Sequence, residues 1–222
     1  MQQFDHLLPG INGLLKTYKV LLLTGIVTFS INALLPLNAQ NPDPEKSIQE
    51  LKEGYLIVRM PTSKAKIDTL TARVAKTTDP DDKLRLQKQL DDAIGERDTL
   101  IADYTKAFRE LYTFSHSAYY LDYEGRDLSK TPFYHMDGSL MSKAEIDQKP
   151  VFYLFFDRAE DGNTDLLIIR DKEGKEIPSP FPNRFSRSGL NFLFLKVSER
   201  SFADWRVEKM NKRLLKYWKQ VL

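Results

Sequence analysis

The chain of 222 residues contains no cysteine. Disulfide bonds, thiol redox chemistry and thiolate metal sites are therefore excluded, because each requires a cysteine sulfur. The anchoring route of bacterial lipoproteins is excluded as well, since it attaches lipid to a cysteine that follows the signal sequence. An exported chain of this kind must hold its fold together through its core alone.

Histidine is scarce, and the glycine-rich motifs of common catalytic sites are missing. Three histidines occur, and only His116 and His135 lie beyond the first forty residues. A zinc site would need a third ligand from Asp or Glu, and no H-x-x-x-H spacing is present. The G-x-S-x-G elbow, the P-loop and the G-x-G-x-x-G turn do not occur either. We therefore expect no cofactor and no metal, and a hydrolase that uses His116 or His135 with nearby acidic residues is the least favoured function.

An excess of charge of one sign is also lacking. The formal net charge is +2, so no global field favours nucleic acid, and binding of a polyanion would depend on a local patch. Apolar residues are plentiful by contrast: hydrophobic residues make up 41% and aromatic residues 11% of the chain. That content is sufficient for a packed core and is typical of a folded domain.

The first forty residues have the composition of a secretory signal. Two lysines precede an apolar run from Val20 to Leu35, and small and polar residues follow. This order predicts a signal peptide over residues 1–39, cleaved after Ala39 or Gln40. A retained membrane helix is the alternative, but polar residues interrupt the run, which is shorter than the ~20 apolar residues that a span needs. We expect a periplasmic or secreted protein, not a lipoprotein, with a polar linker over residues 40–50.

One strand and two helices are predicted next. A β-branched and aromatic run predicts a strand over residues 55–60, and apolar residues three and four apart predict a helix over 63–76. Asp79 and Pro80 are typical of a second helix start, and the pattern continues to Tyr112. The short connection predicts an antiparallel hairpin, which protrudes because ~50 Å of helix exceeds what a small core requires. The surface expected to meet a protein partner or a second copy contains Leu86, Leu90, Arg97 and Tyr104.

The second half of the chain is rich in apolar runs. Strands are predicted over residues 114–123, 150–156, 164–171 and 190–197, and an amphipathic helix is predicted over 201–222. Strands that helices separate favour parallel pairing, whereas closely spaced strands favour antiparallel pairing. The predicted fold is a single α/β domain over residues 51–222. It is a mixed sheet of about five strands with flanking helices, from which the hairpin over residues 63–112 protrudes.

An acidic stretch, DRAEDGNTD, connects two of these predicted strands. Asp157, Asp161 and Asp165 occupy positions one, five and nine of a calcium loop, which makes them weak candidates for metal ligands. The ligand at position three is missing, because Ala159 stands there, and Ile168 replaces the closing glutamate at position twelve. We therefore interpret the stretch as the loop of a β-hairpin.

The predicted C-terminal helix carries the densest positive charge. Its basic residues are Arg206, Lys209, Lys212, Arg213, Lys216 and Lys219. With Trp205 and Trp218 beside them, they would suit an anionic membrane surface or another polyanion. A helix packed on the core with a solvated basic face is the interpretation that we favour. A glycan platform is a further alternative, although core packing explains its aromatic residues equally well: Tyr119, Tyr120, Tyr123, Phe133 and Tyr134.

Two longer segments resemble known proteins. The strand KPVFYLFF, with its partner LLIIRDKEGKEI and a terminal helix, resembles the second half of a thioredoxin-like domain, in which a proline precedes the strand as Pro150 does here. This resemblance implies a redox-inactive scaffold, because the family's cysteine pair has no counterpart. IIRDKEGKEIPSPFPNRF with VEKMNKRLLKYW, and the earlier strand GYLIVRMPT, resemble a group of secreted proteins of Gram-negative bacteria, from which no activity or catalytic residue is carried over.

The sequence therefore predicts an exported protein of the bacterial envelope that binds or supports another molecule without catalysing a reaction. The expected partner is another envelope protein or a second copy of the chain, held through the helical hairpin. Nucleic acid is not expected, and peripheral contact with a glycan or an anionic surface is the alternative.

Overall fold

The computed structural model describes residues 41–123, 130–158, 165–186 and 201–222, all within the compact unit from Asn41 to Leu222. The predicted signal peptide over 1–39 and the predicted strand over 190–197 lie outside these described residues. In the described ranges, no helix has the length and apolar character that a membrane span requires.

The described strands form one mixed sheet. They are β1 (Tyr55–Met60), β2 (His116–Leu121), β3 (Tyr134–His135), β4 (Val151–Arg158), β5 (Asp165–Arg170) and β6 (Arg184–Ser186). The strand order is β3-β2-β1-β4-β5-β6; β1 pairs in parallel with β2 and β4, and the other neighbours pair antiparallel. The prediction of a mixed sheet with flanking helices is thus confirmed. The short strands β3 and β6 lie outside the strands predicted from the sequence, because two or three residues give no detectable alternation.

The helices are α2 (Pro44–Glu53), α3 (Lys64–Lys76), α4 (Pro80–Leu111), α5 (Lys143–Asp147) and α7 (Phe202–Val221). Helix α2 occupies most of the segment predicted as a linker over residues 40–50. The Asp43 side chain caps it by accepting from the Glu45 backbone N–H at 3.0 Å, and Ile48 and Leu51 are fully buried. The prolines and acidic residues that suggest a linker are here the start signals of a helix.

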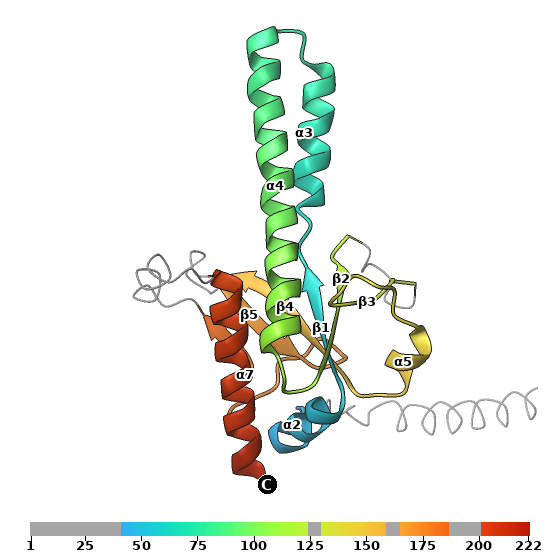
Figure 1. Cartoon of the computed structure of the whole chain (residues 1–222), viewed down its shortest axis with the longest axis vertical. Coiled ribbons are helices and arrows are strands. Elements are labelled where there is room, and N and C mark those ends of the chain that lie inside the picture. Colours follow the sequence, from blue (N-terminus) through green and yellow to red (C-terminus); the bar gives the residue numbers. More distant parts are fainter. Residues whose placement is uncertain (1–40, 124–129, 159–164, 187–200) are drawn as a thin grey trace, which may run out of the picture. The chain divides into compact units, whose positions relative to one another are not determined.

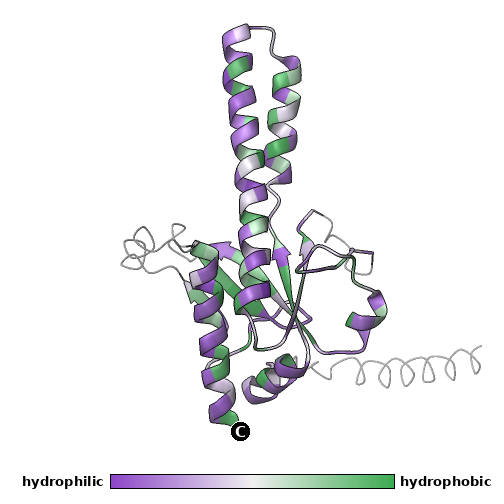
Figure 2. Cartoon of the chain, viewed as in Figure 1, coloured by the Kyte–Doolittle hydropathy of each residue, from purple (hydrophilic) through white to green (hydrophobic). Residues whose placement is uncertain are grey.

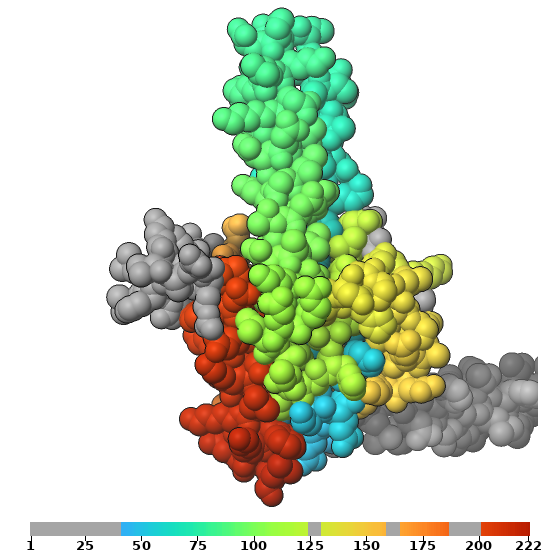
Figure 3. Space-filling model, in the orientation of Figure 1, coloured from blue at the N-terminus to red at the C-terminus, as the bar shows by residue number. Residues whose placement is uncertain are grey.

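The sheet is covered differently on its two faces. One face packs against α2, α4 and α7, and this main core includes Leu56, Leu154, Phe108 and Met210. The other face carries α5 and a smaller cluster around Ile57, Tyr120 and Ile146. Figure 1 shows the arrangement, Figure 2 shows hydrophobic residues along the strands, and Figure 3 shows the side chains of α4 and α7 in contact.

Helix α4 takes part in two separate clusters. Its C-terminal part contributes Tyr104, Ala107 and Phe108 to the main core. Its N-terminal part contributes Leu86, Leu90 and Ala93 to a second cluster with Leu70 of α3, and these two helices lie side by side (Figure 1). Helix α4 begins at Pro80, where the sequence indicates, with Asp79 accepting from the Asp82 backbone N–H at 2.8 Å. We call α3 together with residues 80–103 of α4 the α3–α4 pair.

Candidate functional site

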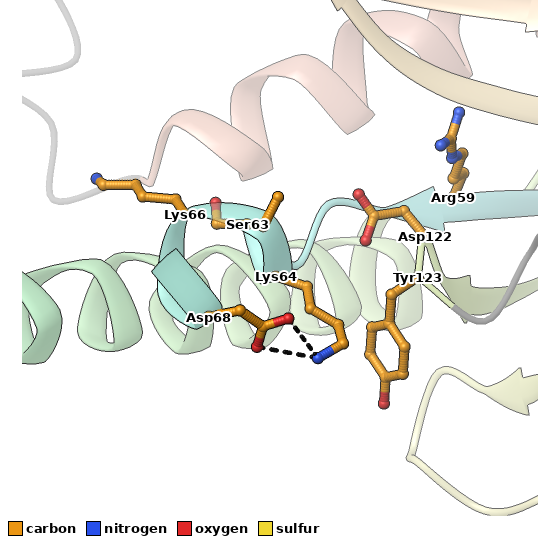
Figure 4. Close-up of a pocket in the computed structure, with 8 residues that line it drawn as sticks. Arg59, Ser63, Lys64, Lys66, Asp68, Asp122 and Tyr123 are labelled. Atoms are coloured by element: carbon orange, nitrogen blue, oxygen red, sulfur yellow. Dashed lines mark hydrogen bonds and ion pairs between the residues drawn. The ribbon is translucent and has the colours of Figure 1, made fainter. Parts of the chain in front are cut away.

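The topology of the sheet creates a crevice at the carboxyl ends of β1 and β2. After β1 the chain forms β2, which pairs with one side of β1, and it later forms β4, which pairs with the other side of β1. In open α/β sheets, ligands bind in crevices beyond the carboxyl ends of the strands. A cavity of ≈ 730 Å³ lies there, and we call it the β1–β2 crevice (Figure 4). Its lining residues are Arg59, Ser63, Lys64, Ala65, Lys66, Asp68, Asp122 and Tyr123.

Two charged residues of the crevice lie on the same face of the sheet. Side chains alternate along a strand, so Arg59 shares the face of Ile57, and Asp122 shares the face of Tyr120. The backbone N–H of Asp122 donates to the Met60 carbonyl at 2.9 Å and extends the parallel ladder. Arg59 on β1 and Asp122, which directly follows β2, therefore lie at the same end of the sheet.

Asp122 is fixed in place by the loop that follows β1. The backbone N–H of Thr62 donates to one carboxylate oxygen of Asp122 at 3.1 Å, and the Thr62 hydroxyl donates to the same oxygen. Thr62 itself is buried, so these bonds connect β2 to the loop between β1 and α3. The second carboxylate oxygen takes no hydrogen bond from any described residue.

Arg59 is the cation of the crevice that has no ion-pair partner among the described residues. Its guanidinium carbon lies 5.8 Å from the centre of the Phe155 ring. The two lysines are paired instead: Lys64 Nζ lies 2.8 Å from Asp68, and Lys66 Nζ lies 3.5 Å from Glu96. Figure 4 shows the Lys64 side chain turned towards Asp68 and the Arg59 side chain directed away from that pair.

Arg59 and Asp122 both influence the pKa of Tyr120. Burial raises the pKa of Tyr120 to about 12, the positive charge of Arg59 lowers it, and the negative charge of Asp122 raises it. Both charges are therefore near the Tyr120 hydroxyl. The arrangement combines a guanidinium, a carboxylate and a buried phenol at one end of the sheet.

Ser63 begins α3 in an unusual conformation. Its φ of 52° places a residue other than glycine in the left-handed region, and its side chain makes no cap hydrogen bond to the helix. The first turn of α3 also contains no acidic residue. The loop between β1 and α3 is thus held by Thr62 and Asp122 rather than by a helix cap.

The residues predicted to form a partner surface lie mostly inside the protein. Leu86 and Leu90 are 3% and 8% exposed between α3 and α4, and Tyr104 is 4% exposed in the main core. Arg97 is partly exposed, and its Nε donates to Asp98 at 2.9 Å. The predicted surface is therefore wrong for Leu86, Leu90 and Tyr104, because the apolar stripe that identifies them is the side on which the helix packs.

The prediction that Arg206 belongs to an exposed basic surface is wrong. It is 4% exposed, and its guanidinium donates to the Tyr104 hydroxyl at 3.1 Å and to the backbone carbonyl of Asp165 at 2.8 Å. It also lies 4.9 Å from the Phe202 ring centre. Arg206 therefore connects α7 to α4 and to the sheet, since a buried guanidinium needs such acceptors.

The remaining basic residues of α7 are largely engaged. Lys209 Nζ lies 4.6 Å from the Trp205 ring, Lys212 pairs with Glu208 at 2.7 Å, and Arg213 donates to the Arg184 carbonyl at 2.8 Å. Lys216 and Lys219 are exposed, whereas Trp218 is half-buried and packs edge-on against Phe114. Helix α7 thus packs on the core with a basic outer face.

The acidic stretch lies where β4 passes into β5. Arg158 and Asp165 are paired in the antiparallel ladder, and Asp157 accepts from Arg170 at 3.4 Å. Asp161 lies outside the described residues. Over the described ranges, no three His, Asp or Glu side chains gather as metal ligands.

The two histidines lie away from the crevice. His116 begins β2, at the opposite end of the strand from Asp122, with its ring 5.1 Å from that of Tyr55. Burial lowers the pKa of His116, and the charges of Lys149 and Lys52 lower it further. His135 belongs to β3, and its Nε2 lies 3.5 Å from Glu145.

The aromatic residues proposed for a glycan platform are divided. Tyr120 and Phe133 are buried in the smaller cluster, whereas Tyr119 and Tyr134 stack with ring centres 5.3 Å apart and are partly exposed. Tyr123 is 45% exposed at the crevice. A second cavity, of ≈ 380 Å³, lies against α5 and is lined mainly by apolar residues: Pro132, Phe133, Leu140, Met141, Ile146 and Tyr153, with Thr131, Lys143 and Asp147.

Sequence reasoning did not identify Arg59 or Asp122. The sequence feature that points to Arg59 is that it is the single charged residue of the apolar strand YLIVRM, and a charge at that position must face away from the main core.

Comparisons of the chain with protein-family models, curated proteins and solved structures find no match.

Proposed function

We propose that the chain is an exported, non-catalytic binding or structural module of the bacterial envelope. In this proposal, the α3–α4 pair acts as a protruding antiparallel hairpin that contacts another envelope protein or a second copy. The observation that carries the proposal is the division of α4 between the main core and a separate cluster with α3.

The α3–α4 pair adds little to the core of the domain. Its own cluster buries only Leu70, Leu86, Leu90 and Ala93 among the described residues. Ordering each residue of the pair costs ~1–2 kcal/mol of backbone entropy, so this small cluster offsets the cost only in part. A long segment that is marginal for stability is best explained by its exposed surface.

The exposed surface of the pair has charge suited to a polar protein contact. Helix α3 contains four basic residues and one acidic residue, and acidic residues outnumber basic residues over 80–103 of α4. Such separated charge favours orientation of a partner and makes its association sensitive to salt. Leu84, 73% exposed near the start of α4, offers an apolar contact within this surface.

The proposal that the protein is exported depends on its N-terminal sequence and on its resemblance to secreted proteins. The predicted signal peptide favours a periplasmic or secreted protein, and the resemblance to secreted proteins of Gram-negative bacteria agrees with this. A redox-inactive thioredoxin-like scaffold is the alternative at the level of fold, and it would leave the binding role unchanged.

The other functional alternatives receive less support. A basic surface for anionic lipid loses Arg206 to the core and Lys212 to an ion pair. A hydrolase would need a histidine beside a carboxylate in one cavity, and neither His116 nor His135 lines a described cavity.

Shortening the α3–α4 pair tests the proposal. Lys66 and Glu96 form an ion pair at 3.5 Å, so these positions lie side by side, and a short Gly-Ser loop can replace residues 67–95 between them. The tagged intact and shortened chains would be cross-linked in their own cells and purified. We expect one stoichiometric partner, or a dimer, with the intact chain only.

A matched control separates loss of binding from loss of folding. The shortened chain should keep the thermal transition of the main core, because the replaced residues belong to the separate cluster. Replacement of the exposed Lys216 and Lys219 by Gln should leave the cross-linked product unchanged. A folded, shortened chain that still captures the same partner would refute the proposed role of the pair.

A further inference from the structure

We propose that the β1–β2 crevice binds a small polar molecule that carries a carboxylate and, across from it, a hydroxyl or ammonium donor. Arg59 takes the carboxylate and Asp122 accepts from the donor. This site is a second function beside protein contact, because the two residues proposed to hold the ligand, Arg59 and Asp122, lie outside the α3–α4 pair.

The chemistry at Arg59 selects the carboxylate. The guanidinium presents a planar fork of donors that matches the two oxygens of a carboxylate. Its guanidinium carbon lies 5.8 Å from the Phe155 ring centre, within the range of a cation–π contact, which favours a defined orientation before a ligand binds. Because Lys64 and Lys66 are already paired with Asp68 and Glu96, Arg59 is the cation whose charge is uncompensated by the described residues.

The chemistry at Asp122 selects the donor. One of its oxygens accepts from Thr62, and the other takes no hydrogen bond from the described residues. The two Thr62 bonds hold the Asp122 carboxylate in place, so its orientation is set before a ligand arrives. A guanidinium on β1 and a carboxylate directly after β2 together favour a ligand that carries both a carboxylate and a hydrogen-bond donor over a simple anion.

The dimensions and polarity of the crevice agree with a small polar ligand. Its volume of ≈ 730 Å³ is within the ~300–1,000 Å³ typical of sites for small molecules. Most lining side chains are charged or hydroxylated, and Tyr123 supplies an exposed ring. A fatty or fully apolar ligand would leave these groups unpaired, which costs free energy.

A matched pair of probes tests the inference. D-Glucuronate carries one carboxylate and several hydroxyls, and D-glucose shares those hydroxyls but has a CH₂OH group in place of the carboxylate. Each would be titrated into the ¹⁵N-labelled chain from Asn41 onwards, and backbone amide shifts would be recorded by NMR. We expect glucuronate to move the amides of residues 59–66 and 122–123, with glucose binding at least about tenfold more weakly.

Two arginine variants test whether Arg59 binds the carboxylate of the ligand. Arg59→Met keeps an unbranched apolar stem against Phe155 and removes the fork, so it should weaken glucuronate binding at least about tenfold. Arg85→Met is the matched control, because Arg85 pairs with Asp82 on α4 and does not line the crevice. It should bind glucuronate as the unaltered chain does.

Asp122→Asn tests the donor side. The amide oxygen can still accept from Thr62, so the fold should persist. The amide nitrogen that replaces the second carboxylate oxygen cannot accept from the ligand's donor, so glucuronate should bind severalfold more weakly. Absence of glucuronate binding, equal binding of glucose, or unchanged binding by a folded Arg59→Met chain would each overturn the inference. Shifts confined to residues outside the crevice would overturn it as well.

Discussion

Gly54, between α2 and β1, is the position at which one added methyl group should be most damaging. An ideal Cβ built on Gly54 would lie 2.2 Å from the Pro150 carbonyl oxygen and 2.8 Å from the Glu50 carbonyl oxygen. Both obstacles are backbone atoms, and real Cβ atoms essentially never approach closer than 3.0 Å. The Gly54→Ala change therefore requires the chain at Pro150 to move by almost an ångström.

The cost follows from what that movement disrupts. The Pro150 carbonyl accepts from the Tyr55 backbone N–H at 2.8 Å and starts the pairing of β1 with β4. The fully buried Leu56 and Ile57 follow immediately on β1, so a shift would propagate into both clusters. We expect Gly54→Ala to lower the free energy of unfolding by about 4 kcal/mol, which is exceptional for a point substitution and a large part of a typical ~5–15 kcal/mol.

Gly95→Ala is the matched control, because it adds the same methyl group at a position where space is available. It lies within α4, and a Cβ at this position would meet nothing within 4 Å beyond its chain neighbours and the backbone of its own helix. Gly95→Ala should stabilise the helix by ~0.5–1 kcal/mol, because alanine loses less backbone freedom than glycine there. Urea denaturation followed by tryptophan fluorescence would measure both variants. A Gly54→Ala chain whose free energy of unfolding stays within about 1 kcal/mol of the unaltered value would refute the packing described around Pro150.

Three further predictions concern single side chains. Arg206→Met should lower the free energy of unfolding by roughly 2–4 kcal/mol, measured by urea denaturation, because the buried Tyr104 hydroxyl and the Asp165 backbone carbonyl lose their donor. Leu90→Ala should cost about 2–4 kcal/mol locally, and hydrogen exchange should accelerate in the α3–α4 pair while the amides of the sheet stay protected. His116 has a lowered pKa in the folded chain, so protonation favours the unfolded state and stability should decline as the pH falls below about 6.5. His116→Gln should make thermal stability less dependent on pH in that range.

The fold was predictable where local signals and tertiary packing agree. The start of α4 follows from Asp79 and Pro80, whose side chain and ring suit a helix N-terminus in almost any context. The strands β1 and β4 follow from continuous apolar runs, which only a sheet covered on both faces can bury. The sequence pattern does not predict helix α2, because its polar residues outnumber Ile48 and Leu51, the two aliphatic residues that pack in the main core.

The candidate site was less predictable, because it depends on how distant segments meet. The stripe of α4 identifies an apolar side, but Leu90 packs on α3 and Tyr104 packs on the main core, and periodicity does not distinguish these environments. Arg206 lies among exposed lysines in the sequence, and only the position of α7 beside Tyr104 makes it a buried donor. Arg59 and Asp122 become neighbours solely through the parallel pairing of β1 with β2.

Site-specific photo-cross-linking in the native cells tests most directly whether the α3–α4 pair is the contact surface. A photoreactive phenylalanine would replace either Leu84, which is 73% exposed on α4, or Leu140, which is 69% exposed on the domain near α5. The two leucines are matched in exposure, so both positions should tolerate the substitution. The proposal predicts a discrete cross-linked product at position 84 and none at position 140. A product at position 140 with none at position 84 would contradict it.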